Sequence, residues 1–255
     1  MIKKILTHPL MRGRDLDDPE TTQIRKTLIR QKQYLEKIYQ EWYALISERL
    51  GKISSPVLEL GAGAGFLEEY IPTLIKTEIF HLNGMDVIVD GTRIPFKNES
   101  LQAIVMTDVF HHIPRPAEFL TEAKRVLQKN GRVVMIEPWV SRWSRWVYPR
   151  FHHEPFQPDV ADWDFPTSGP LSSSNQALPW IVFERDQAQF LAHFPEFSID
   201  CIKPMMPFRY LISGGVSMRS LAPKWSFGFW KWLESLIEKQ MMYLGMFAYI
   251  EILKS

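Results

Sequence analysis

Glycine alternates with small residues in a short stretch that directly follows an apolar run. Residues 57–60 are apolar except for one carboxylate, and glycines stand at positions 61, 63 and 65, before Phe66. Because glycine has no Cβ, backbone N–H groups in such a loop come close to a ligand at the end of a buried strand. Phe66 stands where a dinucleotide site needs a small residue, and no Gly-Lys-Ser/Thr follows to hold phosphates. The loop therefore indicates a ligand without a pyrophosphate or triphosphate at this point.

A carboxylate precedes the glycine loop and is expected to face the ligand. Glu59 lies two residues before Gly61. A carboxylate attracts a positive centre, accepts hydrogen bonds and repels a phosphate. The pattern favours a ligand with a positive centre and hydrogen-bond donors. The alternative is that this stretch is only a strand-to-helix turn in another kind of α/β protein.

Strands and crossovers alternate after residue 56, which predicts a parallel, doubly wound sheet. Strands are expected at 57–60, 76–80, 86–90, 103–107 and 132–137, and helices at 66–74 and 116–128. Ligands on such sheets bind beyond the carboxyl ends of the strands. Five carboxylates lie at or beside these ends: Glu59, Glu78, Asp90, Asp108 and Glu137. We expect them to form a polar rim around a site.

Residues 56–139 resemble the class I S-adenosylmethionine-dependent methyltransferases of the ubiquinone/menaquinone-biosynthesis type, type 11. The resemblance rests on E-x-G-x-G-x-G at 59–65, D-G-T-R-I-P-F at 90–96, D-V-F-H-H-I-P at 108–114 and N-G-R at 130–132, in the family's order. It implies S-adenosylmethionine as cofactor and a methyl acceptor aligned about 3 Å from the methyl group. It also implies a Rossmann-like, mostly parallel seven-stranded sheet with an antiparallel last strand.

The same resemblance implies the residues that bind the cofactor. They are Glu59, Gly61, Ala62, Gly63, Gly65, Glu78, Asp90, Gly91, Thr92, Thr107 and Asp108. Glu78 would take the ribose hydroxyls, and Asp90 would meet the adenine amino group. The connection 81–85 is too short for the family's usual helix, so Asp86 is the runner-up for the ribose. Asp86 begins the next strand, at its wrong end for the ligand, which favours Glu78.

Two adjacent histidines, His111 and His112, follow the fourth strand at the edge that faces the methyl group. Histidine titrates near neutral pH and is a natural general base for a hydroxyl acceptor. A structural role for at least one of them is the alternative. The pair is the one indication that the methyl group goes to oxygen.

The composition changes after residue 140, and eight of the nine tryptophans lie at or beyond Trp139. Residues 141–180 are rich in proline, serine, aspartate and aromatic residues. A loop of this length is usually functional or disordered, and its aromatic content favours an ordered lid. We predict a substrate-side insertion over 141–225, with Trp143, His152 and His153 contacting the acceptor.

The stretch His152-His153-Glu154, with Asp159, Asp162 and Asp164 downstream, is a candidate set of metal ligands. Adjacent histidines do not easily point at one ion. A lid contact with substrate is therefore favoured, and no metal site is predicted.

The remaining chain is expected to complete the core. An N-terminal arm and one helix over 22–50 fill residues 1–51, and the cofactor-binding core spans 52–140. Beyond the core we expect a helix at 186–193, a strand at 198–202, and, in residues 226–255, a helix at 227–243 and a last strand at 247–253. The first helix has a basic face that carries Arg25, Lys26, Arg30, Lys32 and Lys37. We interpret this face as exposed to solvent. Contact with an acidic substrate or an anionic membrane surface is the alternative.

Composition limits the class of protein. The 255 residues carry a formal net charge of +1, which gives no basic field for a nucleic-acid partner. One cysteine excludes an internal disulfide and favours the reducing cytoplasm. No apolar run is long enough for a signal peptide or a membrane span, which leaves peripheral membrane contact open. The oligomeric state is not indicated.

The function predicted is transfer of a methyl group from S-adenosylmethionine to a small-molecule acceptor, at oxygen. One alternative is an accessory protein that binds the cofactor without turnover. Another is a methyltransferase for a lipid-linked or sugar intermediate. A nucleic-acid methyltransferase is disfavoured, because Asp108-Val109-Phe110-His111 stands where a base-flipping Asn/Asp-Pro-Pro-Tyr/Phe motif would be.

Overall fold

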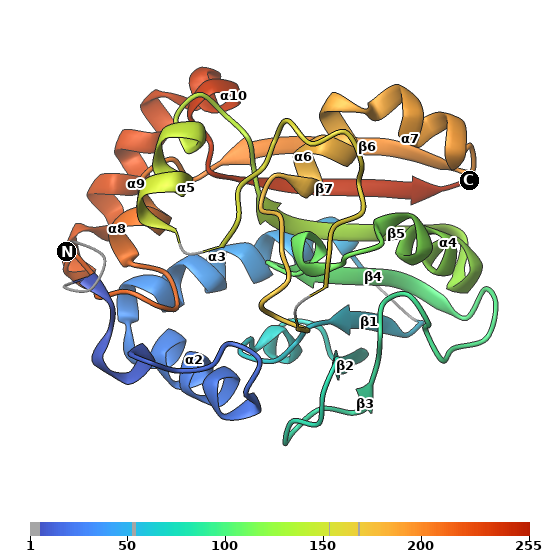
Figure 1. The fold of residues 1–255 in the computed structure, drawn as a ribbon, viewed down its shortest axis with the longest axis horizontal. Coiled ribbons are helices and arrows are strands. Elements are labelled where there is room, and N and C mark those ends of the chain that lie inside the picture. Colours follow the sequence, from blue (N-terminus) through green and yellow to red (C-terminus); the bar gives the residue numbers. More distant parts are fainter. Residues whose placement is uncertain (1–5, 53–54, 153, 168) are drawn as a thin grey trace.

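The computed structural model describes residues 6–52, 55–152, 154–167 and 169–255. A seven-stranded sheet in the order β3-β2-β1-β4-β5-β7-β6 runs through its centre (Figure 1). The strands are β1 (Val57–Leu60), β2 (Leu74–Glu78), β3 (Val87–Ile88), β4 (Leu101–Thr107), β5 (Leu127–Pro138), β6 (Phe197–Met205) and β7 (Phe247–Lys254). The first five pair in parallel, and β7 runs antiparallel between β5 and β6. The predicted fold class is confirmed.

The central strands are buried on both faces, and the side chains of successive residues pack alternately into two separate cores. In β4, Ile104 and Met106 pack into the core that holds Phe119 of α4 (Pro116–Val126). Ala103 and Val105 face the second core, with Trp42 of α3 (Gln33–Leu50). Side chains of a strand point alternately to its two faces, so this near-continuous apolar strand is what a sheet covered on both sides requires.

The single N-terminal helix predicted over 22–50 is wrong. The chain forms α2 (Pro19–Gln31) and α3, with a break at Lys32, whose ψ of 81° is not helical. The ammonium group of Lys32 donates to the carbonyl of Met218 at 2.9 Å and to that of Gly215. These distant backbone partners hold the break, which leaves α2 free to lie at an angle to α3 (Figure 1).

The other elements outside the sheet are helical. The remaining helices are α5 (Ser144–Phe151), α6 (Leu178–Trp180), α7 (Gln187–His193), α8 (Arg209–Ser213), α9 (Phe227–Leu236) and α10 (Met241–Leu244), and the π-helical segment is η4 (Ile181–Arg185). The 3₁₀ helices are η1 (Pro9–Met11), η2 (Leu67–Glu69), η3 (Phe110–His112), η5 (Lys224–Ser226) and η6 (Glu238–Gln240).

Three helices differ from the sequence prediction. The helix expected over 66–74 is only the short turn η2, and the helix expected over 227–243 is interrupted before η6. The helix expected to end at 128 is α4, which stops at Val126 because Leu127 pairs with Leu101 and already belongs to β5.

The segment predicted as a lid is ordered against the sheet edge. The N–H of Phe165 donates to the carbonyl of Pro114 at 3.1 Å, and the N–H of Asn175 donates to that of His111 at 2.9 Å. These bonds tie the segment to the loop after β4. Within the described ranges, each helix is too short or too polar to cross a membrane.

Candidate functional site

A cavity lies at the carboxyl ends of β1, β2 and β4, where doubly wound sheets bind their ligands. Most of the predicted site residues line it: Glu59, Gly61, Ala62, Gly63, Gly65, Glu78, Asp90, Gly91, Thr107, Asp108, His112 and His152. Thr92, His111 and Trp143 are not among its lining residues. His153 lies outside the described residues.

The glycine loop is packed so closely that side chains are excluded. A Cβ on Gly63 would stand 2.6 Å from Oε2 of Glu78, and one on Gly61 would stand 2.6 Å from a methyl group of Val109. Gly61 also has φ of +66°, which favours glycine. The N–H of Ala62 donates to the carbonyl of Thr77 at 2.9 Å and anchors the loop on β2. The loop therefore brings bare backbone and the Glu78 carboxylate to the same wall of the cavity.

Of the two carboxylates considered for the ribose, Glu78 lines the cavity and Asp86 does not. Oε1 of Glu78 accepts the N–H of Ile79 at 2.9 Å, and burial raises the pKa of this carboxyl. Asp86 is exposed and accepts the N–H of Lys76 at 2.8 Å. The position of Glu78 at the end of β2 agrees with the sequence argument.

Asp90 and Thr92 form a local turn rather than two separate contacts. Oδ1 of Asp90 accepts both the N–H and the hydroxyl of Thr92, each at 2.8 Å. Thr92 is buried and Asp90 is exposed at the cavity wall. Thr92 therefore orients Asp90 and does not itself reach the cavity.

Several buried polar atoms at the cavity wall lack a hydrogen-bond partner among the described residues. They are Oε2 of Glu59, Oγ1 of Thr22, Nε of Arg25 and Oγ1 of Thr107. Burial, with a further contribution from the Glu68 carboxylate, raises the pKa of Glu59 to about 8. Buried polar groups are nearly always hydrogen-bonded in native proteins, so this set indicates a ligand with both donors and acceptors.

Asp108 directly follows β4 and has a strained backbone. Its φ is +63°, a region that residues other than glycine rarely adopt and that is often found at functional sites. Burial raises the pKa of Asp108 to about 7, the carboxylates of Glu154 and Glu137 add to the rise, and His111 opposes it. The side chain is thus a proton acceptor or donor near neutral pH.

His111 is held by carboxylates on both sides. Its Nδ1 lies 2.7 Å from Oε2 of Glu137, and its Nε2 lies 3.3 Å from Oε2 of Glu154. Glu137 also accepts the N–H groups of Val109 and Phe110, both at 2.7 Å. Burial opposes a charge on the imidazole, but the hydrogen bonds to Glu137 and Glu154 raise the pKa of His111 well above its usual value.

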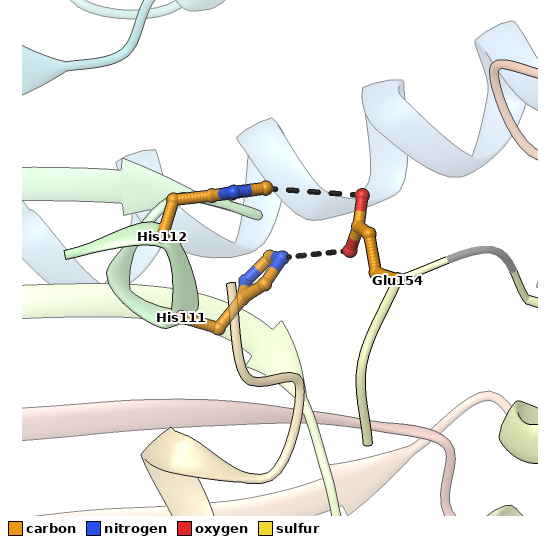
Figure 2. A group of neighbouring side chains, drawn as sticks. All are labelled: His111, His112 and Glu154. Carbon is orange, nitrogen blue, oxygen red and sulfur yellow. Dashed lines mark hydrogen bonds and ion pairs between the residues drawn. The ribbon is translucent and has the colours of Figure 1, made fainter. Parts of the chain in front are cut away.

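His112 differs from its neighbour because it lines the cavity. Its Nδ1 lies 2.9 Å from the carbonyl of Ser173, which can only accept, so Nδ1 carries the proton. The lone pair of the neutral ring is then on Nε2, 3.9 Å from Oε1 of Glu154 (Figure 2). Burial and the neighbouring His111 lower the pKa of His112 to about 4.

The three residues predicted on the substrate side lie in different surroundings. His152 lines the cavity, with Nδ1 accepting the amide N–H of Gln176 at 2.7 Å. Trp143 instead donates its indole N–H to the carbonyl of Pro207 at 2.8 Å and stacks on Trp146. Within the insertion, it connects the start of α5 to the loop before α8.

Sequence reasoning missed a group of residues that reach the cavity from outside the glycine-loop core. They are Thr22, Arg25, Tyr39, Tyr43, Tyr148 and Tyr210. The solvated interpretation of the basic helix face is wrong for Arg25, because the break at Lys32 leaves α2 lying over the cavity. The sequence analysis grouped Glu154 with His152 and His153 as a candidate metal ligand. It did not predict that Glu154 lies next to His111 and His112.

A glycine loop and acidic strand ends around a cavity of this sheet define the class I methyltransferase fold. Residues 58–135 match the family model described as a methyltransferase domain, so this stretch carries a methyltransferase domain of that family. The comparison with curated proteins gives no match.

Solved structures align with this chain at low identity. A SAM-dependent methyltransferase from Aquifex aeolicus aligns at 13% identity and a TM-score of 0.44, over 84% of this chain and 89% of that chain. Geranyl diphosphate C-methyltransferase from Streptomyces coelicolor A3(2), crystallised with Mg²⁺, geranyl-S-thiolodiphosphate and S-adenosyl-L-homocysteine, aligns at 10% identity and a TM-score of 0.50, over 85% and 76%. The [4+2]-cyclase SpnF aligns at 14% and 0.47, over 84% and 80%. The likeness to the C-methyltransferase concerns the fold alone.

Proposed function

We propose that the protein transfers the methyl group of S-adenosylmethionine to an oxygen atom of a small-molecule acceptor. The observation that carries the proposal is a shared cavity. At one end Glu78 lies against the bare backbone of Gly63, and a buried oxygen of Glu59 has no hydrogen-bond partner within the described part of the chain. At the other end the same cavity is lined by Asp108 and His112.

The cofactor residues fit an adenosyl ligand with a cationic amino-acid end. Glu59 would pair with the α-ammonium group, and this contact would restore the charge that burial disfavours on the carboxylate. Glu78 would accept hydrogen bonds from both ribose hydroxyls, and Asp90 would accept one from the adenine amino group. When bound, the cofactor supplies a positively charged sulfonium with a transferable methyl group.

The acceptor end is lined by aromatic and apolar side chains. Tyr148 and Phe151 come from the insertion, Tyr210 from α8, and Met246 directly precedes β7. Apolar walls with a few polar groups are typical of small-molecule sites. We infer an acceptor that presents a ring or other apolar surface beside the oxygen to be methylated.

Asp108 lines the cavity and has the pKa that best suits a base for the acceptor's proton. A catalytic base works best when its pKa is near the operating pH, and Asp108, with a pKa of about 7, meets this condition. It would accept the hydroxyl proton as the acceptor oxygen bonds to the methyl carbon and the carbon–sulfur bond breaks, with the electron pair left on sulfur. His112, with a pKa of about 4, is the second candidate and the weaker base.

A lipid-linked acceptor is the second candidate substrate, favoured by the surface around α9. Trp225, Phe229, Trp232 and Leu236 are 84%, 54%, 56% and 60% exposed. Amphipathic helices with Trp, Phe and Leu on their apolar face lie in the interfacial layer of membranes.

We further propose that the protein works in the cytoplasm without a nucleic-acid partner. The sole cysteine, Cys201, is a free thiol, which the reducing cytoplasm preserves. The net charge of +1 gives little long-range attraction for a polyanion.

Two measurements on the native protein test the proposed function. Titration calorimetry with S-adenosylhomocysteine should show one site, and absence of binding would refute the cofactor assignment. Methyl-labelled S-adenosylmethionine incubated with a deproteinised metabolite extract should then yield a labelled product. Binding without labelled product would favour the accessory protein that does not turn over.

A further inference from the structure

Three side chains from two distant parts of the chain converge at the acceptor end of the cavity. His111 and His112 come from η3, and Glu154 comes from the insertion (Figure 2). One ligand atom from each lies within 4.8 Å of the others. The two imidazoles are not directed apart, although the residues are adjacent, because the tight 3₁₀ turn places the ring centroids 4.1 Å from each other.

Each of these side chains also has a hydrogen-bond partner outside the cluster. Nδ1 of His111 is bonded to Glu137, and Nδ1 of His112 is bonded to the carbonyl of Ser173. The amide of Gln176 donates to Oε2 of Glu154 at 3.2 Å. Metal-binding histidines almost always donate their second ring N–H to a carboxylate or a backbone carbonyl, and metal-binding carboxylates are hydrogen-bonded in turn.

The orientation of His112 directs its second ring nitrogen at the carboxylate. Because Nδ1 of His112 lies 2.9 Å from the carbonyl of Ser173, which can only accept, the other nitrogen, Nε2, faces Oε1 of Glu154 at 3.9 Å. This separation is too long for a direct hydrogen bond. A metal ion between the imidazole nitrogen and the carboxylate oxygen would be attracted to both.

We propose that Nε2 of His111, Nε2 of His112 and the Glu154 carboxylate bind one divalent transition-metal ion. Two imidazoles and one carboxylate suit zinc, cobalt, nickel or iron and not magnesium or calcium, which prefer oxygen ligands. Three protein ligands leave a position open, and His112 and Glu154 line the cavity, so the open position faces the acceptor.

The site has a chemical role that rests on the proposed function. A metal ion at this place would bind the acceptor hydroxyl and make its proton more acidic. The proton would leave to Asp108 or to water as the oxygen attacks the methyl carbon. The carbon–sulfur bond then breaks with its electron pair on sulfur, and the products are the methylated acceptor and S-adenosylhomocysteine. The acceptor class would be a hydroxyl or phenol that can bind a metal.

The test is a titration of metal-free protein with Co²⁺, followed by visible absorption. A protein-bound Co²⁺ ion with nitrogen ligands should give absorption bands that saturate at one equivalent and disappear when Zn²⁺ is added. Mg²⁺ at the same concentration should leave the bands unchanged. This readout needs no acceptor and no turnover.

Matched variants locate the ion. Glu154→Gln and His112→Gln should each weaken Co²⁺ binding at least about 100-fold, and Glu137→Gln should weaken it by about 10–100-fold through the orientation of His111. The controls are Glu118→Gln and His81→Gln, which change exposed side chains away from the cavity and should bind Co²⁺ like the native protein. Circular dichroism of each variant verifies the fold.

The outcomes separate this site from the cofactor site. If native protein binds S-adenosylhomocysteine but gives no saturable Co²⁺ bands, the metal proposal is overturned and the proposed function stands. If the bands form but Glu154→Gln and His112→Gln leave them unchanged, the ion binds elsewhere and the proposal is also overturned. If the metal binds and S-adenosylhomocysteine does not, the metal site stands and the proposed function fails.

Discussion

The two ends of the cavity are built in different ways. At the cofactor end, polar groups come from a glycine loop and strand ends from residue 59 to residue 107, and several buried polar atoms have no hydrogen-bond partner among the described residues. At the acceptor end, His111 and Glu154 come from segments more than 40 residues apart and are already hydrogen-bonded to each other. The cofactor end is therefore incomplete without its ligand, whereas the acceptor end is held in shape by the protein's own contacts.

The largest effect is expected from Gly63→Arg, which should abolish S-adenosylhomocysteine binding. Its Cβ would stand 2.6 Å from Oε2 of Glu78 and 2.8 Å from a methyl group of Thr22, so the new side chain must fill the cofactor end. Gly228→Arg on α9 is the control, because a Cβ there meets no atom within 4 Å. A folded Gly63→Arg protein that still binds the ligand in calorimetry would show that the loop is not the cofactor contact.

Asp108→Asn should lower methyl transfer much more than cofactor affinity. Methyl transfer to the metabolite extract should fall by about 10²–10⁴, the usual contribution of a general base, while S-adenosylhomocysteine affinity stays within about threefold. Asparagine accepts the left-handed backbone at this position, so the fold should persist. Equal losses of affinity and transfer would place Asp108 at the cofactor end instead.

Glu78→Gln compared with Asp86→Asn should decide which acid binds the ribose. Loss of a charged hydrogen-bond acceptor costs about 1.5–3 kcal/mol, so Glu78→Gln should weaken S-adenosylhomocysteine affinity about 10–100-fold. Asp86→Asn should leave the affinity near the native value, since Asp86 does not line the cavity. Calorimetry that gave the reverse order would assign the ribose to Asp86.

The smallest effect is a pH dependence of cofactor affinity that originates at Glu59. In the free protein burial raises the pKa of Glu59 to about 8, and the ammonium group of the ligand should lower it again. The complex then holds fewer protons than the free protein, so binding releases a proton and affinity rises with pH, by up to about tenfold per unit below pH 8. Calorimetry from pH 6 to 8.5 measures the slope.

Glu59→Gln is the control for this slope, because glutamine does not titrate. Its affinity should be flat over the same range. A native protein whose affinity falls as pH rises would contradict the assignment. For the free protein, the same raised pKa means that unfolding free energy decreases between about pH 4.5 and pH 8, since the folded state holds the Glu59 proton longer than the unfolded state.

The sequence was most informative where function depends on local chain geometry. The glycine loop, Glu59 before it and Glu78 at the end of β2 are set by strand ends and by residues a few positions apart. Their approach to one cavity follows from the parallel order of the strands. The seven-stranded sheet with its antiparallel last strand was predicted by resemblance to the family and is confirmed.

The acceptor end could not be predicted in this way, because its geometry depends on tertiary contacts. The break between α2 and α3 depends on carbonyl groups at 215 and 218, which lie far from Lys32 in the sequence. Glu154 meets His111 only because the insertion folds back over the loop after β4. The sequence also gave no sign that the 3₁₀ turn η3 brings two adjacent imidazoles together.

The N-terminal arm has a consequence for the order in which ligands bind. Just before α2, Asp17 accepts the N–H groups of Leu171 and Ser172, at 2.7 and 2.9 Å, and the Ser172 hydroxyl at 2.7 Å. The next residue, Ser173, holds His112 through its carbonyl. Since Thr22 and Arg25 of α2 line the same cavity, one N-terminal segment is linked both to the cavity wall and to the contacts that hold the His112 imidazole. We therefore expect an ordered sequence in which the cofactor enters first and the acceptor binds second.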